Sequence, residues 1–157
     1  MLKRFAAVCL ALIGLPVWAA DPFPPPEVLA HYSGKVVYVD FWASWCAPCA
    51  ESFPWLNTLQ AKFGPNLVVV GVNVDEDPAD ADAFLHRRPA SFDIVRDPKG
   101  EIAARYNIPG MPTSLLLDAE GHVIHRHSGF RRNEIPEYEA AISRALNTPH
   151  PAQGSQP

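Results

Sequence analysis

The sequence predicts an α/β fold with a mixed central sheet flanked by helices. Three observations lead to this prediction: β-branched and aromatic runs alternate with stretches of helical spacing, two further strand-like runs flank a glycine turn, and an amphipathic helix follows them. Alternating strands and helices form parallel neighbours, whereas the last two strands form an antiparallel hairpin. At 157 residues the chain has room for one domain of ordinary size.

The composition is that of a globular protein with an acidic balance. Hydrophobic residues make up 48% of the chain and charged residues 19%, which suits a packed core better than a disordered or fibrous chain. Lys and Arg number 13 against 17 Asp and Glu, so the formal net charge is -4. A phosphate backbone is neutralised by basic residues, so this balance argues against nucleic acid as a partner.

The first predicted strand and the helix after it hold the most informative segment. Val36–Phe41 is a run of β-branched and aromatic residues, which is typical of a strand buried on both faces. Over residues 49–63 apolar residues recur at helical spacing, and Gly64-Pro65 predicts the end of that helix. We expect Pro54 to kink this helix without ending it.

The remaining elements alternate between strand and helix before a hairpin and a last helix close the domain. Gly121 lies where the hairpin loop needs a positive φ. In chain order we expect a strand over 67–72, a helix from Asp77-Pro78 to about Arg88, a strand over 92–95, a helix near 101–106, strands over 113–117 and 122–127, and a helix over 134–146.

Residues 1–19 have the pattern of a secretory signal peptide. A basic head at residues 3–4 precedes an apolar run over 5–17, and Ala19 ends a small-residue cleavage motif. The alternative is an uncleaved membrane anchor, but the run contains Pro16 and is shorter than the ~20 apolar residues of a spanning helix. We therefore expect a soluble, exported protein that meets a membrane only if the signal stays uncleaved.

Two proline-rich segments mark the edges of the expected domain. Seven of the 17 prolines lie in Asp21–Pro26 and Thr148–Pro157. Such segments are typical of extended, poorly ordered chain. We expect residues 20–33 to form an N-terminal extension and residues 148–157 a disordered tail, which leaves 34–147 as the folded domain.

Cys46 and Cys49 carry the chemical interpretation. Cys9 lies in the expected signal peptide, so the exported chain keeps these two cysteines in a C-x-x-C pattern. A structural staple is the weaker interpretation, because so short a loop restrains the unfolded chain little. A zinc site usually needs a second C-x-x-C or two well-spaced histidines, and neither follows. The pattern therefore favours redox chemistry.

Four separate stretches add to this interpretation: Gly34–Cys49, Pro54, Gly71–Asp75 and Gly110–Thr113. In this order they resemble the thioredoxin superfamily, and within it the exported TlpA and ResA-like thiol-disulfide oxidoreductases. The resemblance covers residues 34 to 146. It implies a thioredoxin fold in which a TlpA-like helix-strand insertion separates the βαβ half from the C-terminal ββα half, so the domain 34–147 is expected to be thioredoxin-like.

Each cysteine then has an expected role. Cys46 lies at a predicted helix N-terminus, where free N–H groups and the helix dipole favour its thiolate, so we expect it to be the nucleophile. Cys49 lies one turn into the helix and is expected to be the resolving thiol, which attacks the mixed disulfide. The reactive group is the Cys46–Cys49 disulfide, and we expect no other cofactor.

Asp40 is the expected buried acid beneath the disulfide. It stands six residues before Cys46 in an apolar strand, where burial should raise its pKa, and by resemblance it exchanges a proton with Cys49. The alternative is an Asp that ends the strand at the surface, but apolar residues continue beyond it. Many TlpA-like proteins carry a Glu three residues after the second cysteine, whereas this chain has Ser52 there and Glu51 beside it. Asp40 therefore carries more of the expected proton transfer.

Gly110, Met111 and Pro112 are expected to shape a substrate groove. By resemblance Pro112 is a cis-proline that faces the disulfide, and a plain turn proline is the alternative. The backbone at Met111 could pair with an extended segment of a partner. Trp45 is expected to cover the site and limit solvent access.

His122, His125 and His127 suggest a metal site as an alternative. On a strand His125 and His127 share a face, and two imidazoles could hold copper or zinc. An exposed edge strand rich in polar residues is the simpler interpretation. We therefore expect no metal ligands here.

The expected function is thiol-disulfide exchange with protein substrates in a bacterial periplasm. The Ala47-Pro48 dipeptide lacks a His before Cys49, which resembles the reducing branch of the superfamily and favours a reductase. The resemblance implies a membrane electron donor of the DsbD type and a role in cytochrome c or copper-oxidase assembly. Two alternatives stay open: a disulfide-forming oxidase of secreted proteins, and a copper metallochaperone that uses Cys46 and Cys49.

Overall fold

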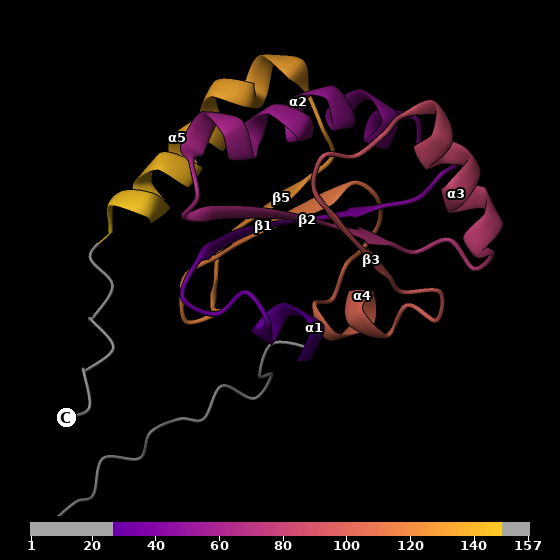
Figure 1. The fold of residues 1–157 in the computed structure, drawn as a ribbon, viewed down its shortest axis with the longest axis horizontal. Coiled ribbons are helices and arrows are strands. Elements are labelled where there is room, and N and C mark those ends of the chain that lie inside the picture. Colours follow the sequence, from indigo (N-terminus) through magenta and orange to yellow (C-terminus); the bar gives the residue numbers. More distant parts are fainter. Residues whose placement is uncertain (1–26, 149–157) are drawn as a thin grey trace, which may run out of the picture.

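The computed structural model describes residues 27–148 as one central sheet with helices on both faces (Figure 1). Five strands lie in the order β3-β2-β1-β4-β5. β1, β2 and β3 run parallel, whereas β4 is antiparallel to both β1 and β5. The predicted mixed sheet is confirmed. Its strands are β1 (Val36–Trp42), β2 (Leu67–Asn73), β3 (Asp93–Arg96), β4 (Thr113–Leu117) and β5 (Val123–Ser128).

Three longer helices cover one face of the sheet, and two short helices cover the other (Figure 1). The first group is α2 (Ala47–Phe63), α3 (Pro78–Arg87) and α5 (Ile135–Asn147). The second group is α1 (Glu27–Ala30) and α4 (Glu101–Arg105). A 3-10 turn, η1 (Arg132–Glu134), leads into α5. The two faces therefore enclose two separate hydrophobic clusters.

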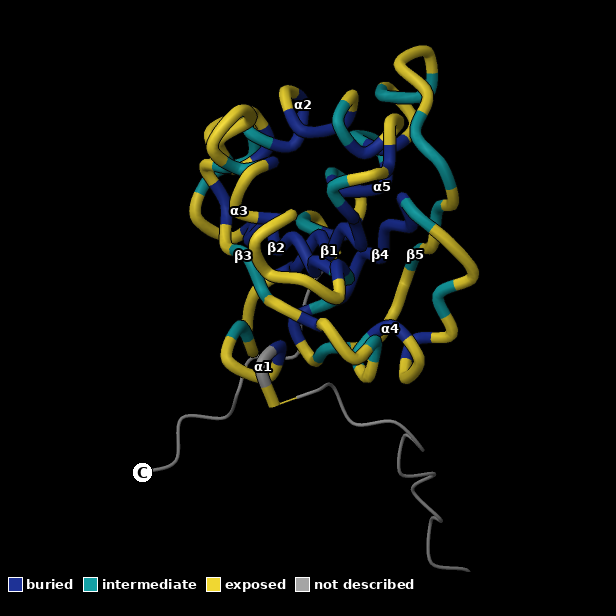
Figure 2. Tube along the Cα trace, turned by 90° about the vertical axis from the view of Figure 1, so that its right-hand side faces the viewer, coloured by how far each residue is buried: buried dark blue, intermediate teal, exposed yellow. Residues whose placement is uncertain are grey.

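β1 lies at the centre of the sheet and all of its residues are buried. Successive side chains point to opposite faces. Tyr38 and Trp42 pack in the cluster with both cysteines, whereas Val39 and Phe41 pack in the other cluster. By this alternation Asp40 points to the face of the cysteines. Figure 2 shows this buried centre, while β5 at the sheet edge has only exposed and partly exposed residues.

The predicted helix ends have clear local causes. α2 continues through Pro54 and ends at Gly64, which has a φ of 80°. Asp77 caps α3, because its Oδ1 accepts a hydrogen bond from the Ala79 N–H at 2.9 Å. Gly121 has a φ of 88°, as its place in the hairpin loop requires. The sequence placed no helix in residues 20–33, but α1 forms there because Leu29 is buried in the cluster below the sheet.

The signal peptide expected over residues 1–19, the segment Asp21–Pro26 and residues 149–157 lie outside the described residues. Signal cleavage and the disordered tail therefore stay predictions. In the part of the chain from 27 to 148, no helix is both long and apolar enough to cross a bilayer.

Candidate active site

A disulfide joins Cys46 to Cys49 at the start of α2. β1 ends at Trp42, and a short loop brings the chain to Cys46, which is the N-cap residue of the helix. The backbone N–H of Cys49 donates a hydrogen bond to Cys46 Sγ at 3.2 Å. The sulfur of Cys46 thus lies beside the free N–H groups of a helix N-terminus, which stabilise a thiolate once the disulfide is reduced.

The two cysteines differ slightly in how far they are buried. Cys49 is fully buried, whereas Cys46 is 5% exposed and the neighbouring Trp45 is 71% exposed. A partner can therefore approach the site at Cys46 and Trp45 but cannot reach Cys49 directly. This difference supports the expected roles of attacking and resolving thiol.

Asp40 is a buried acid with one strong partner. Its Oδ1 accepts a hydrogen bond from the Ser114 hydroxyl at 2.7 Å, and its Oδ2 has no hydrogen-bond partner within the described part of the chain. Burial raises the pKa of Asp40 from 3.8 to about 7, while the Ser114 hydrogen bond acts in the opposite direction. A carboxyl with this pKa can take and give a proton near neutral pH.

The peptide bond between Met111 and Pro112 is cis, and it leads directly into β4. Met111 packs against the cluster that contains both cysteines. The Pro112 carbonyl accepts a hydrogen bond from the Gly129 N–H at 2.8 Å, and the Thr113 hydroxyl donates to the Gly110 carbonyl at 2.7 Å. These contacts hold the segment from Gly110 to Pro112 beside the cluster that contains the disulfide, and its role in binding a substrate stays a prediction.

The helix after the cysteines offers no buried acid near them. Ser52 is buried, and its hydroxyl donates to the Cys49 carbonyl at 2.9 Å. Glu51 is exposed, with one carboxylate oxygen 3.9 Å from Nε of Arg132. Ser52 stands where many TlpA-like proteins carry a Glu. Its side chain therefore points inward at that position, but it offers a hydroxyl in place of a carboxylate.

Asp75 was not singled out by sequence reasoning, although the loop before the cysteines depends on it. This buried carboxylate accepts hydrogen bonds from the Ser44 N–H at 2.9 Å and from the Ser44 hydroxyl at 3.0 Å. It also accepts from the Asn73 side chain at 2.7 Å. Its partner Ser44 lies 31 residues away in the chain. Only the pairing of β1 with β2 brings the two together, so the stretch Gly71–Asp75 did not reveal the contact with Ser44.

The histidines of the hairpin do not form one group. His122 Nδ1 lies 3.2 Å from Asp118, whereas His127 Nε2 lies 2.7 Å from the Tyr138 hydroxyl. Within residues 27–148, the one group of three or more possible metal ligands with ligand atoms close together is exposed and consists of Asp118, Glu120 and His122. It includes neither cysteine, and His127 serves as a hydrogen-bond partner of α5.

Fold and site together define a class of protein. It is a thioredoxin-like α/β domain with a disulfide at the N-terminus of the helix that follows the central strand, and with a cis-proline before the antiparallel strand. The sequence profile of the Redoxin family matches residues 26–142, so the chain belongs to the redoxin family.

Three similar proteins make the relationship more specific. The chain is 32% identical over 117 residues to the thiol-disulfide oxidoreductase ResA of Bacillus thuringiensis subsp. konkukian, across 73% of this chain and 68% of ResA. A crystal structure assigned to the thiol:disulfide interchange protein DsbE of Chlorobium tepidum is 44% identical, with a TM-score of 0.74 over 80% of this chain and 92% of that chain. A secreted Mycobacterium tuberculosis disulfide oxidoreductase homologous to E. coli DsbE is 27% identical, with a TM-score of 0.60 over 71% and 85%.

These findings confirm the thioredoxin-like fold. They place the chain among the thiol-disulfide oxidoreductases of the ResA and DsbE type, which agrees with the C-x-x-C disulfide at the start of α2.

Proposed function

We propose that the protein is an exported reductase of protein disulfides that works through Cys46 and Cys49. The observation that carries the proposal is the disulfide at the N-terminus of α2, with the shielded sulfur on Cys49 and the approachable one on Cys46. Export is supported by the signal-like pattern of residues 1–19 and by the secreted relative from Mycobacterium tuberculosis.

The exchange takes two steps. In the reduced protein the Cys46 thiolate attacks a partner disulfide, so a bond forms between Cys46 and one partner sulfur, the partner's own S–S bond breaks, and one partner thiolate leaves. Asp40 then takes the thiol proton of Cys49. The Cys49 sulfur attacks Cys46, the Cys46–Cys49 bond forms, and the second partner thiolate leaves. The partner has gained two electrons, and its two thiolates take up protons from solvent.

The partner docks as an extended segment along Gly110, Met111 and Pro112, with Trp45 at the border of the site. A membrane thiol carrier of the DsbD type returns two electrons and reopens the Cys46–Cys49 disulfide. The reducing direction is supported by the Ala47-Pro48 dipeptide, which has no His beside Cys49. The role in cytochrome c or copper-oxidase assembly is the one that the resemblance to TlpA and ResA-like proteins implies, and the similarity to ResA and DsbE agrees with that resemblance.

The direct test is reduction of a small disulfide substrate by the purified, reduced protein without added metal. Cys46→Ser should abolish the reaction, because it removes the attacking sulfur. Cys49→Ser should complete the first attack and then stop as a stable mixed disulfide, because the resolving thiol is absent. Activity that persists in Cys46→Ser would contradict the proposal, and so would a stoichiometric metal ion that is lost only with Cys46, which would favour a metallochaperone.

A further inference from the structure

Asp40 belongs to a row of residues that crosses the sheet on the face covered by α5. Asp40 pairs in register with Ser114 on β4, and Ser114 pairs with His127 on the edge strand β5. Register partners on neighbouring strands point to the same face. The inner part of the row is already bonded, because the Ser114 hydroxyl donates to Asp40 Oδ1 at 2.7 Å.

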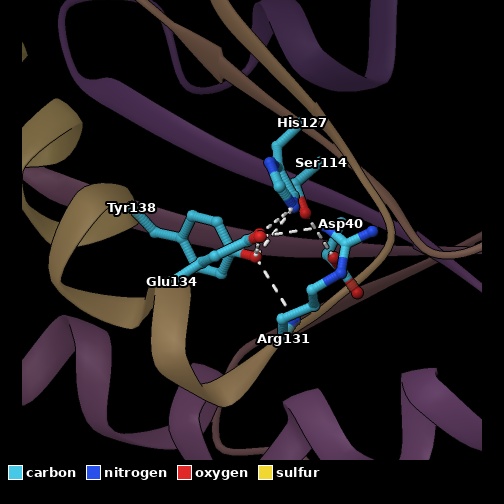
Figure 3. A network of polar contacts seen from close by, with 6 residues as sticks. All are labelled: Asp40, Ser114, His127, Arg131, Glu134 and Tyr138. Atoms are coloured by element: carbon cyan, nitrogen blue, oxygen red, sulfur yellow. Dashed lines mark hydrogen bonds and ion pairs between the residues drawn. The ribbon is translucent and has the colours of Figure 1, made fainter.

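A second polar cluster begins where this row ends. Tyr138 of α5 lies over His127, with 2.7 Å between its hydroxyl and His127 Nε2. The hydroxyl donates to Glu134 Oε2 at 2.8 Å and accepts from the Arg131 N–H at 3.3 Å. A tyrosine hydroxyl has one hydrogen, so His127 Nε2 supplies the hydrogen of the contact with Tyr138. Figure 3 shows both groups of contacts, from Asp40 and Ser114 to Glu134 and Arg131.

A cavity of about 10 Å³ is lined by residues of both groups. This volume is close to the smallest that holds one water molecule, which also needs two to four polar partners. Ser114 of the inner group and His127 and Tyr138 of the outer group all line this cavity, together with apolar side chains. The two groups therefore face one small space, and the path proposed below crosses it through a single water between Ser114 and His127.

We propose that Ser114, His127, Tyr138 and Glu134 form a path that carries protons between the buried Asp40 and solvent. The proposal rests on the proposed function, because Asp40 needs an outlet for protons only if it serves Cys49. Glu134 forms the outer end, since its side chain is 25% exposed. These are positioning and relay residues, and none of them touches the reacting sulfurs.

Each step along the path conserves the proton. Cys49 gives its thiol proton to the Asp40 carboxylate as the Cys46–Cys49 bond forms. Once Asp40 is protonated, the Ser114 hydroxyl turns its hydrogen from Asp40 Oδ1 to the water in the cavity, so that Ser114 accepts the Asp40 proton and passes its own hydrogen to the water. His127 takes the proton from the water at Nδ1 as its Nε2 hydrogen moves to the Tyr138 oxygen, and Tyr138 passes its own hydrogen to Glu134, which releases it to solvent. No electron moves along the path, since the electrons stay with the sulfurs.

The titratable and charged groups around the path favour this direction. Burial and the hydrogen bond to Glu134 raise the pKa of Tyr138 to about 12, so it passes protons without losing one for long. The hydrogen bonds from Tyr138 and Arg131 lower the pKa of Glu134, so an ionised acceptor stands at the exit. The other facing groups come from the elements packed around the path: Tyr38 of β1, His125 of β5, Cys49 of α2, and Glu139 of α5, which is engaged by Trp55 and Lys62.

Rapid mixing of the reduced full chain, with Cys9→Ser in every variant so that only two thiols remain, with excess dithiobis(nitrobenzoate) separates the two attacks, because each releases one coloured thiolate. The first phase reports attack by Cys46 and depends on reagent concentration, whereas the second reports attack by Cys49 and does not. We expect Tyr138→Phe and His127→Gln to slow the second phase about tenfold near pH 6, where Asp40 starts protonated, and to leave the first phase unchanged. Near pH 9 the variants should match wild type, because Asp40 has then already lost its proton.

Matched controls separate a relay from a structural effect. Tyr32→Phe removes another hydroxyl-carboxylate bond, from Tyr32 to Asp93, and His122→Gln removes another imidazole-carboxylate contact, so both should match wild type at every pH. Ser114→Ala should slow the second phase and Ser114→Thr should restore it, because threonine keeps the hydroxyl. If Tyr138→Phe and His127→Gln both match wild type near pH 6, the proton path is wrong while the exchange activity stands. If wild type shows no second phase, the proposed function itself fails and the path fails with it.

Discussion

Asp40 is buried beside Ser114 on the face of the sheet that carries the cysteines, whereas Glu51 lies on the exposed side of α2. Ser52 stands at the position where many TlpA-like proteins carry a Glu. Its side chain points inward, and its hydroxyl donates a hydrogen bond to the Cys49 carbonyl. Of these groups only Asp40 combines an acidic side chain with burial that shifts its pKa toward neutral. The proposed proton transfer to Cys49 therefore depends on one acid.

We expect Asp40→Asn to slow release of the mixed disulfide and to spare the first attack by Cys46. Asparagine keeps the size and the acceptor for Ser114 but cannot take a proton from Cys49. Glu51→Gln is the matched control and should turn over like wild type, because Glu51 points to solvent. Rapid-mixing kinetics with one disulfide substrate measures both steps. Normal turnover in Asp40→Asn together with a stalled Glu51→Gln would show that the helix carboxylate is the proton carrier.

Asp40 should also make the stability of the oxidised protein depend on pH. Its pKa is raised from 3.8 to about 7 on folding, so between these values the native state holds a proton that the unfolded state has lost. The contribution of Asp40 to the free energy of unfolding therefore falls by about 4 kcal/mol as pH rises from about 4 to about 7. Above that pH it changes little.

Asp40→Asn removes this dependence and should be more stable than wild type above about pH 7. Urea unfolding of the disulfide form at several pH values measures the difference, with Asp80→Asn, an exposed aspartate of α3, as control. If the free energies of unfolding of wild type and Asp40→Asn change with pH in the same way, the pKa of Asp40 is the same in the native and the unfolded protein, and the prediction is wrong.

At the level of elements, the end of β2 holds the loop that connects β1 to α2. Asp75 follows β2 and binds both the backbone and the hydroxyl of Ser44, two residues before Cys46. Asn73, at the end of β2, donates a further hydrogen bond to the same carboxylate. A buried carboxylate with these donors positions the Trp45-Cys46 segment at the helix start.

We expect Asp75→Asn to lower the free energy of unfolding by about 1 to 3 kcal/mol, because the new amide group faces donors and leaves one of them unpaired. It should also slow the first attack by Cys46, since the loop no longer fixes the helix start. Asp97→Asn is the matched control: Asp97 is equally buried and accepts from the Ala103 N–H at 2.9 Å, far along the chain from the cysteines. If the rate of the first attack is the same in Asp75→Asn as in wild type, Asp75 does not position Cys46.

The sequence predicted the elements well where local signals were strong. The buried runs that became β1 and β2, the proline and glycine signals around α2 and α3, and the hairpin glycine at 121 are each local features. α1 escaped prediction because its formation depends on burial of Leu29 against strands far along the chain. The turn η1 before α5 was also not expected, and it replaces the predicted helix start at Glu134.

At the scale of the whole molecule, the site divides into a part that the sequence predicts and a part that only the sheet reveals. Cys46, Cys49 and the Gly110–Pro112 segment stand in short motifs, so their grouping could be inferred from resemblance. Ser114 and His127 join Asp40 only through the registers of β1 with β4 and of β4 with β5. Register depends on packing across the sheet, so no single stretch of sequence encodes the row.

The most direct test of the account is the equilibrium reduction potential of the Cys46–Cys49 couple, measured by thiol alkylation of the full chain with Cys9→Ser in defined redox buffers. A thioredoxin-like helix start without a histidine between the cysteines predicts a potential nearer to that of thioredoxin, about -270 mV, than to that of DsbA, about -120 mV. A value close to -270 mV supports a reductase. A value close to -120 mV would contradict the reducing direction and make the protein an oxidase of secreted cysteines.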